Sequence, residues 1–415
     1  MRRSLVPVFA LLLALPLIVF AGSDPATGKL IVHEWGTFTT FVGSDGGQLA
    51  FRAGIGSDLP SFVLTRAEQA DRFNPRNGFD KWELFTKDET VAQVRMETPV
   101  IYFYTDAPRD VEARVEFPQG MLTEFYPPVR SMTPSYDPKD GRDVLKGTSL
   151  DWGKIRIVPQ ATSAKYPKVE GPSHYVHARA TDAATVQFSD RPTEMHEENF
   201  LFYRGLGNFY MKVTASARED DQITLHNSSG GPISIAFLIR SAGGGRMRFA
   251  IHRNLDNGRQ EGMTLPSKES SVGELSEAVV QALIAEGLYE KEARAMVKTW
   301  EDNWFGEEGT GTRVLYLLSR KSTGELLPLT ITPTPDQTVR VMVGRIDVLT
   351  REQESRIATM FRKTATKEPL TAAEAREVNA LGRFQRPALE RVAQLQAWDV
   401  LNAVRTSASA QASGK

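Results

Sequence analysis

The clearest pattern of hydrophobic and polar positions in the chain is a strict alternation over residues 110–117. The apolar positions are Val111, Ala113, Val115 and Phe117, and the charged positions are Asp110, Glu112, Arg114 and Glu116. Strict alternation is typical of an antiparallel strand with one face in the core and one in water. We therefore expect a half-buried strand here, with Val115 inside and Glu116 outside.

A second pattern, in residues 30–42 (LIVHEWGTFTTFV), is apolar or β-branched on both faces. Leu30, Val32, Glu34 and Phe38 share one face at a period of two, and His33 and Trp35 lie on the other. This composition predicts a strand that is covered on both sides. A carboxylate in such a strand is costly unless it is paired, hydrogen-bonded or protonated, so Glu34 needs a partner.

Other short strand-like segments recur up to about residue 257, and many are joined by turns rich in glycine. Pro99 indicates a break or an edge position within the segment 91–104. Residues 53–90 carry little pattern and are interpreted as a long, partly helical insertion. Further strands are expected at 152–158, 174–180, 185–188, 199–204, 208–215, 222–225, 233–240 and 246–252. Such spacing is typical of an antiparallel sandwich or barrel.

The pattern becomes helical near Ser270. Residues 274–287 and 289–305 both have helical spacing, and in the second Ala293, Met296, Val297, Trp300 and Trp304 form one apolar stripe. Strands are expected again at 313–319, 326–331 and 338–349. Two later helices are predicted by capping-box spacings, Thr350 with Gln353 and Thr371 with Glu374.

These patterns predict an α+β protein, with a large antiparallel β-sandwich-like region followed by a mixed helix-and-strand C-terminal region. The predicted divisions are a signal peptide at 1–21, a β-rich domain at 22–257, an α/β region at 258–405 and a disordered tail at 406–415.

The N-terminus has the pattern of a secretory leader, because two arginines precede an apolar run from Leu5 to Ala21. We expect cleavage after Ala21, a periplasmic or secreted protein, and no stable membrane span afterwards. An uncleaved anchor is the alternative. The absence of cysteine excludes disulfides and a lipoprotein anchor. Cleavage leaves 48 of the 50 basic residues against all 51 acidic ones, so nucleic acid is not expected as a partner.

Several motifs are distinctive as a set: HEWGTF (33–38), METPVIYFY (96–104) and, within ENFLFYRGLGNF, the string FLFYRG (200–205). Together they resemble an uncharacterised family of secreted bacterial proteins. The resemblance implies that the chain is a complete exported bacterial protein, and it implies no activity, cofactor or catalytic residue.

Four carboxylates beside aromatic or apolar residues are the candidates for catalysis: Glu34, Glu97, Glu124 and Glu198. Two facing carboxylates are what a glycosidase needs. Solvated or ion-paired acids are the simpler interpretation of each one. Arg204, in an apolar run, is the expected partner of Glu34, with Glu97 and Glu198 as competitors.

Arg204 could instead clamp a substrate carboxylate or phosphate. It is a candidate ligand-binding residue together with His33 and Trp35 of the first strand. No metal site or other cofactor is predicted, because His174 and His177 would point to opposite faces of a strand, and HExxH is absent. No G-x-S-x-G elbow is present either.

The sequence therefore predicts an exported, non-catalytic module that binds a polar small molecule, a glycan or a protein partner. The alternative is a carboxylate-dependent hydrolase such as a glycosidase.

Overall fold

The structure is a computed structural model of the 415-residue chain. It describes residues 28–52, 59–73, 91–133, 147–159, 164–171, 173–217, 219–243, 245–306 and 311–397. The predicted signal peptide, most of the predicted insertion at 53–90 and the predicted disordered tail lie outside the described residues.

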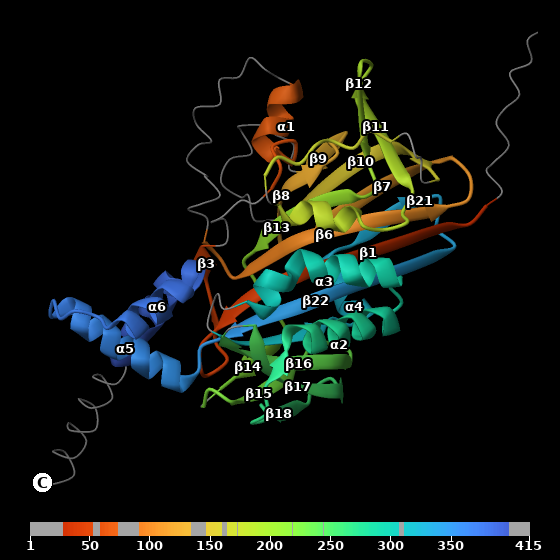
Figure 1. The fold of residues 1–415 in the computed structure, drawn as a ribbon. Helices are drawn as coiled ribbons and strands as arrows, with labels where there is room; N and C mark the ends of the chain where they lie inside the picture. The colour runs from red at the N-terminus through yellow and green to blue at the C-terminus, as the bar shows by residue number, and fades with distance from the viewer. Residues whose placement is uncertain are drawn as a thin grey trace, which may run out of the picture.

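The main feature of the fold is a sheet of eleven strands (Figure 1). In spatial order they are β19 (Ser270–Ser271), β17 (Arg246–Leu255), β16 (Ile233–Gly243), β20 (Thr312–Leu317), β22 (Gln337–Val348), β1 (Leu30–Val42), β6 (Val94–Thr105), β13 (Leu201–Gly207), β8 (Gly120–Tyr126) and β4 (Leu64–Thr65), with β2 (Gln48–Leu49) paired to β1. Every neighbouring pair is antiparallel except β1 and β22, which run parallel.

Three smaller sheets accompany it. The six-stranded one contains β12 (Glu194–Glu198), β11 (Thr185–Arg191), β10 (Thr148–Val158), β7 (Arg109–Phe117) and β21 (Leu329–Thr332), with β9 (Ser131–Thr133) paired to β10. The three-stranded one contains β14 (Val213–Ser216), β15 (Gln222–Asn227) and β18 (Gln260–Thr264), and β3 (Phe51–Arg52) pairs with β5 (Val91–Ala92).

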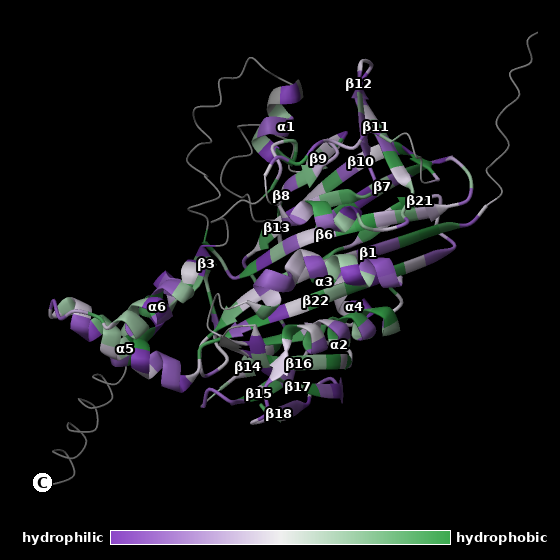
Figure 2. Ribbon diagram, in the orientation of Figure 1, coloured by the Kyte–Doolittle hydropathy of each residue, from purple (hydrophilic) through white to green (hydrophobic). Residues whose placement is uncertain are grey.

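The large sheet is covered on both faces, which makes the architecture sandwich-like. On one face Val32, Phe38 and Ile346 join a core with residues of the six-stranded and three-stranded sheets. On the other face Trp35 and Val341 pack with two helices. Figure 2 shows hydrophobic positions along the strands in the middle of the large sheet and many hydrophilic positions on α5 and α6.

The helices are mostly in the C-terminal half of the chain. Among the described residues they include α1 (Arg66–Phe73), α2 (Val272–Ala285), α3 (Glu290–Phe305), α4 (Arg320–Leu326), α5 (Arg351–Ala365) and α6 (Ala372–Ala380), with short 3₁₀ helices η4 (His174–Arg179) and η5 (Gly382–Phe384). Residues 385–397 are also helical. α2 and α3 cover the large sheet, while α5 and η5 contribute to a third core around Phe41. None of the helices in the described part of the chain is long and apolar enough to cross a bilayer.

Most of the local predictions are confirmed. All positions of β1 except Ile31 are buried, as expected for a strand covered on both sides. In β7, Val115 is buried and Glu116 is half-exposed. The capping boxes begin α5 and α6, with Thr350 and Thr371 as the N-cap residues.

The apolar stripe of α3 is also confirmed, because all five of its residues belong to the core beside the large sheet. The α+β class is confirmed as well, with large, mainly antiparallel sheets and a helical C-terminal region. Since the large sheet takes strands from both sides of residue 257, that boundary does not separate two sheets.

Pro99 interrupts a central strand. β6 pairs with β1 on one side and β13 on the other, so the alternative of an edge position is wrong. Both ladders are irregular at this point, with shifts between Trp35 and Thr37 and between Phe202 and Gly205. Thr98 has a φ of 48°. The predicted break is therefore a β-bulge, which accommodates a proline that cannot donate a ladder hydrogen bond.

Two local predictions are wrong. Residues 174–180 form η4 rather than a strand, and Ser173 caps it by accepting from the backbone N–H of Tyr175. A serine that bonds the backbone two residues ahead favours a turn over an extended strand. The strand predicted at 326–331 is divided between the end of α4 and β21.

Candidate functional site

Glu34, the residue that most needed a partner, lies in a buried ion pair. Its carboxylate is fully buried and accepts from Arg340 Nε at 2.5 Å and from the hydroxyl of Tyr203. Arg340 is directly opposite Glu34 in the parallel β1–β22 ladder. The charge is therefore neutralised by the neighbouring strand.

The predicted pairing of Glu34 with Arg204 is wrong, because the two side chains lie on opposite faces of the sheet. Tyr203, which contacts Glu34, belongs to the core between the sheets. Arg204 is the next residue and shares a face with Phe202, whose ring lies 5.8 Å from the guanidinium carbon. Phe202 belongs to the helix-covered core.

Arg204 is instead close to the bulge of β6. It is 3% exposed, donates to Thr98 Oγ1 at 3.3 Å and is opposite Glu124 of β8. Glu124 is equally buried and accepts a hydrogen bond from the hydroxyl of Thr123. Arg204 and Glu124 are thus buried residues of the large sheet, beneath the surface of the molecule.

Glu97 lies on the same face of the large sheet as Arg204, and it joins β6 to the C-terminal helices. Arg383 of η5 donates to its carboxylate at 2.8 Å, and Arg95 Nε lies 3.0 Å from the same oxygen. Thr39 donates to the other oxygen at 2.9 Å. Burial alone would raise the pKa of Glu97, but the charges of Arg383 and Arg95 outweigh it and hold the pKa below its usual value.

Glu198 is held by a different arginine. Arg179 of η4 donates to both carboxylate oxygens, with Nη2 2.7 Å from Oε2, and Tyr175 donates at 3.1 Å. The arginine also lies over the rings of Phe62 and Tyr166. Complete burial of the carboxylate still raises the pKa of Glu198, because desolvation exceeds the effect of Arg179.

The two candidate ligand-binding residues of β1 are fully buried. His33 Nδ1 lies 2.7 Å from a carboxylate oxygen of Glu292 in α3, and Tyr104 donates to the other oxygen at 2.7 Å. Burial, and then the charge of Glu292, raises the pKa of Tyr104. Trp35 packs against the ring of Tyr102. His33 and Trp35 therefore connect the sheet to α3 and do not reach the surface.

An accessible feature lies elsewhere, on the outer face of the three-stranded sheet. A groove of about 650 Å³ is lined by Ser44, Asp45, Ser216, Ala217, Gln222, Ile223, Thr224, His226, Gln260, Gly262, Met263, Thr264 and Arg351. Its volume is within the range of about 300–1,000 Å³ that is common for small-molecule sites.

The floor of the groove follows from the register of its strands. Gln222 is opposite Thr264, Thr224 is opposite Gly262, and His226 is opposite Gln260. Because Ile223 and Leu225 alternate with them and face the core, these polar side chains share the outer face. Among the described residues, the floor carries hydroxyls, amides and one imidazole, and no carboxylate or amine.

One wall of the groove is the turn between β1 and β2. The backbone N–H and hydroxyl of Ser44 both donate to Glu354 of α5, at 3.1 and 2.6 Å. Ala217 donates its backbone N–H to the carbonyl of Ser44 at 2.9 Å. Asp45 pairs with Arg391 at 2.7 Å. The turn is thus fixed to the sheet on one side and to the C-terminal helices on the other.

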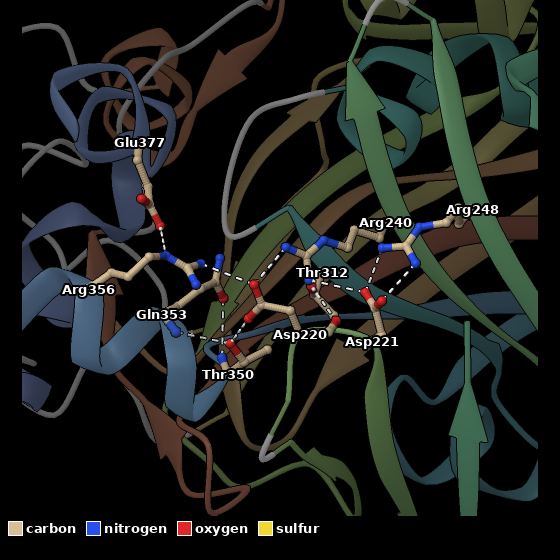
Figure 3. Close-up of polar contacts among 9 residues, drawn as sticks. All are labelled: Asp220, Asp221, Arg240, Arg248, Thr312, Thr350, Gln353, Arg356 and Glu377. Carbon is tan, nitrogen blue, oxygen red and sulfur yellow. Dashed lines mark hydrogen bonds and ion pairs between the residues drawn. The ribbon is translucent and has the colours of Figure 1, made fainter. Parts of the chain in front are cut away.

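A second set of contacts holds the start of α5 against the strands (Figure 3). Asp220, just before β15, accepts from the hydroxyl of Thr350, from Arg240 at 2.7 Å and from Arg356 at 3.2 Å. Burial would raise the pKa of Asp220, but these donors outweigh it and lower the pKa. Arg351, which lines the groove, donates its backbone N–H to Ala217.

Asp221 extends this network. It accepts two hydrogen bonds from Arg248 of β17, at 2.7 and 2.6 Å, and these lower its pKa (Figure 3). Glu377 of α6 accepts from Arg356 at 2.9 Å. These contacts hold the start of α5, whose Arg351 lines the groove, against β16 and the residues that precede β15.

The structure thus does not bring the seven predicted residues into one site. Glu97, Glu124 and Arg204 lie on the helix-covered face near the bulge, Glu34 lies on the opposite face, and Glu198 lies with η4. The sequence interpretation missed the groove residues. Their signal was the alternation in residues 222–226 (QITLH), where Gln222, Thr224 and His226 alternate with two apolar residues.

Comparisons with known proteins add no assignment. No family model matches the chain, and no curated protein matches it. Among solved structures, one similar chain is the Fcho1 Mu homology domain of Danio rerio with a bound Eps15 peptide. The likeness has a TM-score of 0.23 and 7% identity, and it covers 78% of this chain and 95% of that one. A likeness at this level carries no argument about fold or function.

Proposed function

We propose that this protein is a non-catalytic extracytoplasmic module that binds a neutral, hydroxyl-rich ligand such as a glycan in the groove of the three-stranded sheet. The observation that carries the proposal is the neutral polar floor, in which Gln222, Thr224, His226 and Gln260 present donors and acceptors side by side. Sugar hydroxyls need both kinds of partner, and a charged floor would not supply them in this balance.

The groove lining contains no Phe, Tyr or Trp ring among its described residues, so hydrogen bonds rather than stacking would hold the ligand. Its walls are already fixed through Ser44 and Asp220, as described above. A wall that is ordered before binding costs little entropy when the ligand arrives. The predicted leader at 1–21 supports an extracytoplasmic location, where glycans are abundant.

The hydrolase alternative is supported less well. The four candidate carboxylates are each 3% exposed or less, and arginines engage Glu34, Glu97 and Glu198 directly. A glycosidase needs two carboxylates that face each other across an open cleft. None of these four has that geometry.

The test uses Gly262, which lies in the middle of the floor. A Cβ built on Gly262 meets no heavy atom within 4 Å, so Gly262→Tyr fills the groove without disturbing the core. The purified mature protein is screened on an array of neutral oligosaccharides, and hits are measured by calorimetry. We expect binding by the wild type and a loss of roughly tenfold or more in Gly262→Tyr.

Gly324 of α4 provides the matched control, because a Cβ there also meets open space and the residue is not part of the groove. Gly324→Tyr should bind as the wild type does. The proposal is overturned if no neutral glycan binds, or if Gly262→Tyr binds as tightly as the control.

A further inference from the structure

A second cluster of polar side chains lies on the hairpin of β11 and β12. Asp190 lies near the end of β11, at an irregularity in the ladder between Phe188 and Arg191. Glu194 and His196 are in β12 and, being two residues apart, share one face. The irregularity places Asp190 beside them, so one nitrogen and two carboxylates converge at this end of the sheet.

The distances within the cluster resemble those of a metal site. His196 Nε2 lies 3.5 Å from Asp190 Oδ1 and 3.5 Å from Glu194 Oε1. One atom from each of the three residues lies within 4.8 Å of the others. Tetrahedral Zn²⁺ with bonds of about 2.0–2.2 Å keeps its ligand atoms roughly 3.3–3.6 Å apart. Both 3.5 Å separations fall in that range.

Arg72 of α1 leaves the two proposed carboxylate ligand atoms available, but it is hydrogen-bonded to His196 Nε2, and a cation would have to replace that hydrogen bond. Its Nη2 lies 2.8 Å from Asp190 Oδ2 and 2.9 Å from Glu194 Oε2, so it uses the other oxygen of each carboxylate. Its Nη2 also donates a weak, 3.5 Å hydrogen bond to His196 Nε2. An arginine that holds the second oxygen of a ligating carboxylate is a common way to orient the first.

Asp190 gives an independent indication. Its side chain is 1% exposed, and Oδ1 has no hydrogen-bond partner among the described residues. Buried carboxylate oxygens are almost always satisfied, and one that is not requires an explanation. Oδ1 faces the imidazole nitrogen, where a cation would satisfy both atoms.

We propose that Asp190, Glu194 and His196 bind one first-row divalent cation, with Zn²⁺ the best match. Asp190 Oδ1, Glu194 Oε1 and His196 Nε2 supply three ligands and leave a fourth position for water or another group. One imidazole with two carboxylates suits Zn²⁺ better than Ca²⁺, which takes six to eight oxygen ligands. The proposal replaces the sequence-based expectation of no metal, which rested on the opposite faces of His174 and His177 in a strand and on the absence of an HExxH spacing.

The cation site is independent of the groove. β12 lies at one end of the molecule and β18 at the other (Figure 1). Loss of cation binding therefore does not test ligand binding in the groove, and loss of ligand binding does not test the cation site.

The test measures Zn²⁺ itself. The full chain is stripped with a chelator, equilibrated with Zn²⁺ and analysed for bound metal by equilibrium dialysis and by calorimetry. We expect about one zinc ion per chain in the wild type. Ca²⁺ should not compete, and Co²⁺ in place of Zn²⁺ should give the strong visible absorption of tetrahedral coordination.

Two variants and one control complete the experiment. His196→Gln and Glu194→Gln each remove a ligand and should weaken binding by roughly tenfold or more. Glu194 is 39% exposed, so its variant should keep the fold even where a change at His196 lowers stability. Glu197→Gln is the control, because Glu197 is adjacent in β12 and instead accepts from Lys165 and Gln187. Absence of Zn²⁺ binding, or equal binding by Glu194→Gln and the control, would overturn the proposal.

Discussion

Replacing Arg340 by methionine should cost the protein much of its stability. The change leaves the carboxylate of Glu34 fully buried, with the hydroxyl of Tyr203 as its remaining hydrogen-bond partner among the described residues. It also removes the 2.6 Å hydrogen bond to the carbonyl of Leu327. Breaking a buried ion pair by removing one partner typically costs about 3–5 kcal/mol.

The structure supports a value in that range. Arg340 Nε lies 2.5 Å from Glu34 Oε2, and the two side chains are 14% and 0% exposed. Two unit charges about 4 Å apart at an effective dielectric constant of about 20 attract each other by about 4 kcal/mol. Burial of the pair makes screening by salt small, so the loss should persist at high ionic strength.

Urea unfolding of a double-mutant cycle measures the effect. Glu34→Gln, Arg340→Met and the double variant are compared with the wild type, and we expect a coupling of about 2–3 kcal/mol. Arg156→Met is the control, because Arg156 pairs with Asp110 at 3.0 Å but both side chains are largely exposed. The control should change stability by less than about 1 kcal/mol. Additive losses in the cycle would refute the reasoning.

Three further outcomes are expected. Val115→Asp should lower the melting temperature strongly because Val115 is fully buried, whereas Glu116→Lys should stay within about 0.5 kcal/mol of the wild type, and equal losses would contradict the register of β7. Glu97 has a folded pKa below its unfolded value, so its contribution to stability is present above pH 4.5 and is lost as the pH falls further. Acid titration of Glu97→Gln should accordingly show less loss of stability below pH 4.5 than the wild type, and parallel curves would exclude this. N-terminal sequencing of the exported protein should begin at Gly22, and recovery of the intact leader would contradict cleavage after Ala21.

The local features of the fold were predictable because their energetics are local. The alternation around Val115 determines which face of β7 enters the core. The hydroxyls of Thr350 and Thr371 bond backbone groups three residues away, and a short stretch of sequence contains both partners. A short sequence pattern is therefore enough to predict features of this kind.

The partner of Glu34 was not predictable in this way. The sequence showed that the carboxylate needs a cation, but Arg340 is 306 residues away along the chain. Arg204 was the more conspicuous arginine because it lies in an apolar run, and the direction of its side chain became clear only from the sheet. The sequence around Glu34 shows that its carboxylate needs a partner. Which residue is that partner depends on the order of the strands in the sheet.

The groove and the hairpin cluster show the same limit. Residues 222–226 alternate visibly, but the floor also needs Gly262 from another strand. Asp190 meets Glu194 and His196 only because the ladder of the hairpin is irregular. Sequence spacing alone does not reveal such an irregularity.

The parallel pairing of β1 with β22 has a consequence for how the chain reaches its folded state. Arg340 of β22 follows Glu34, its partner in the β1–β22 ladder, by 306 residues, so β22 is synthesised long after β1. Contacts so distant in sequence form late and slow folding. Until then one edge of a strand that is apolar on both faces stays open to other chains, which is a hazard for aggregation. A chain truncated before Gln337 would leave that edge of β1 permanently unpaired. Pairing with β22 therefore protects β1 from aggregation.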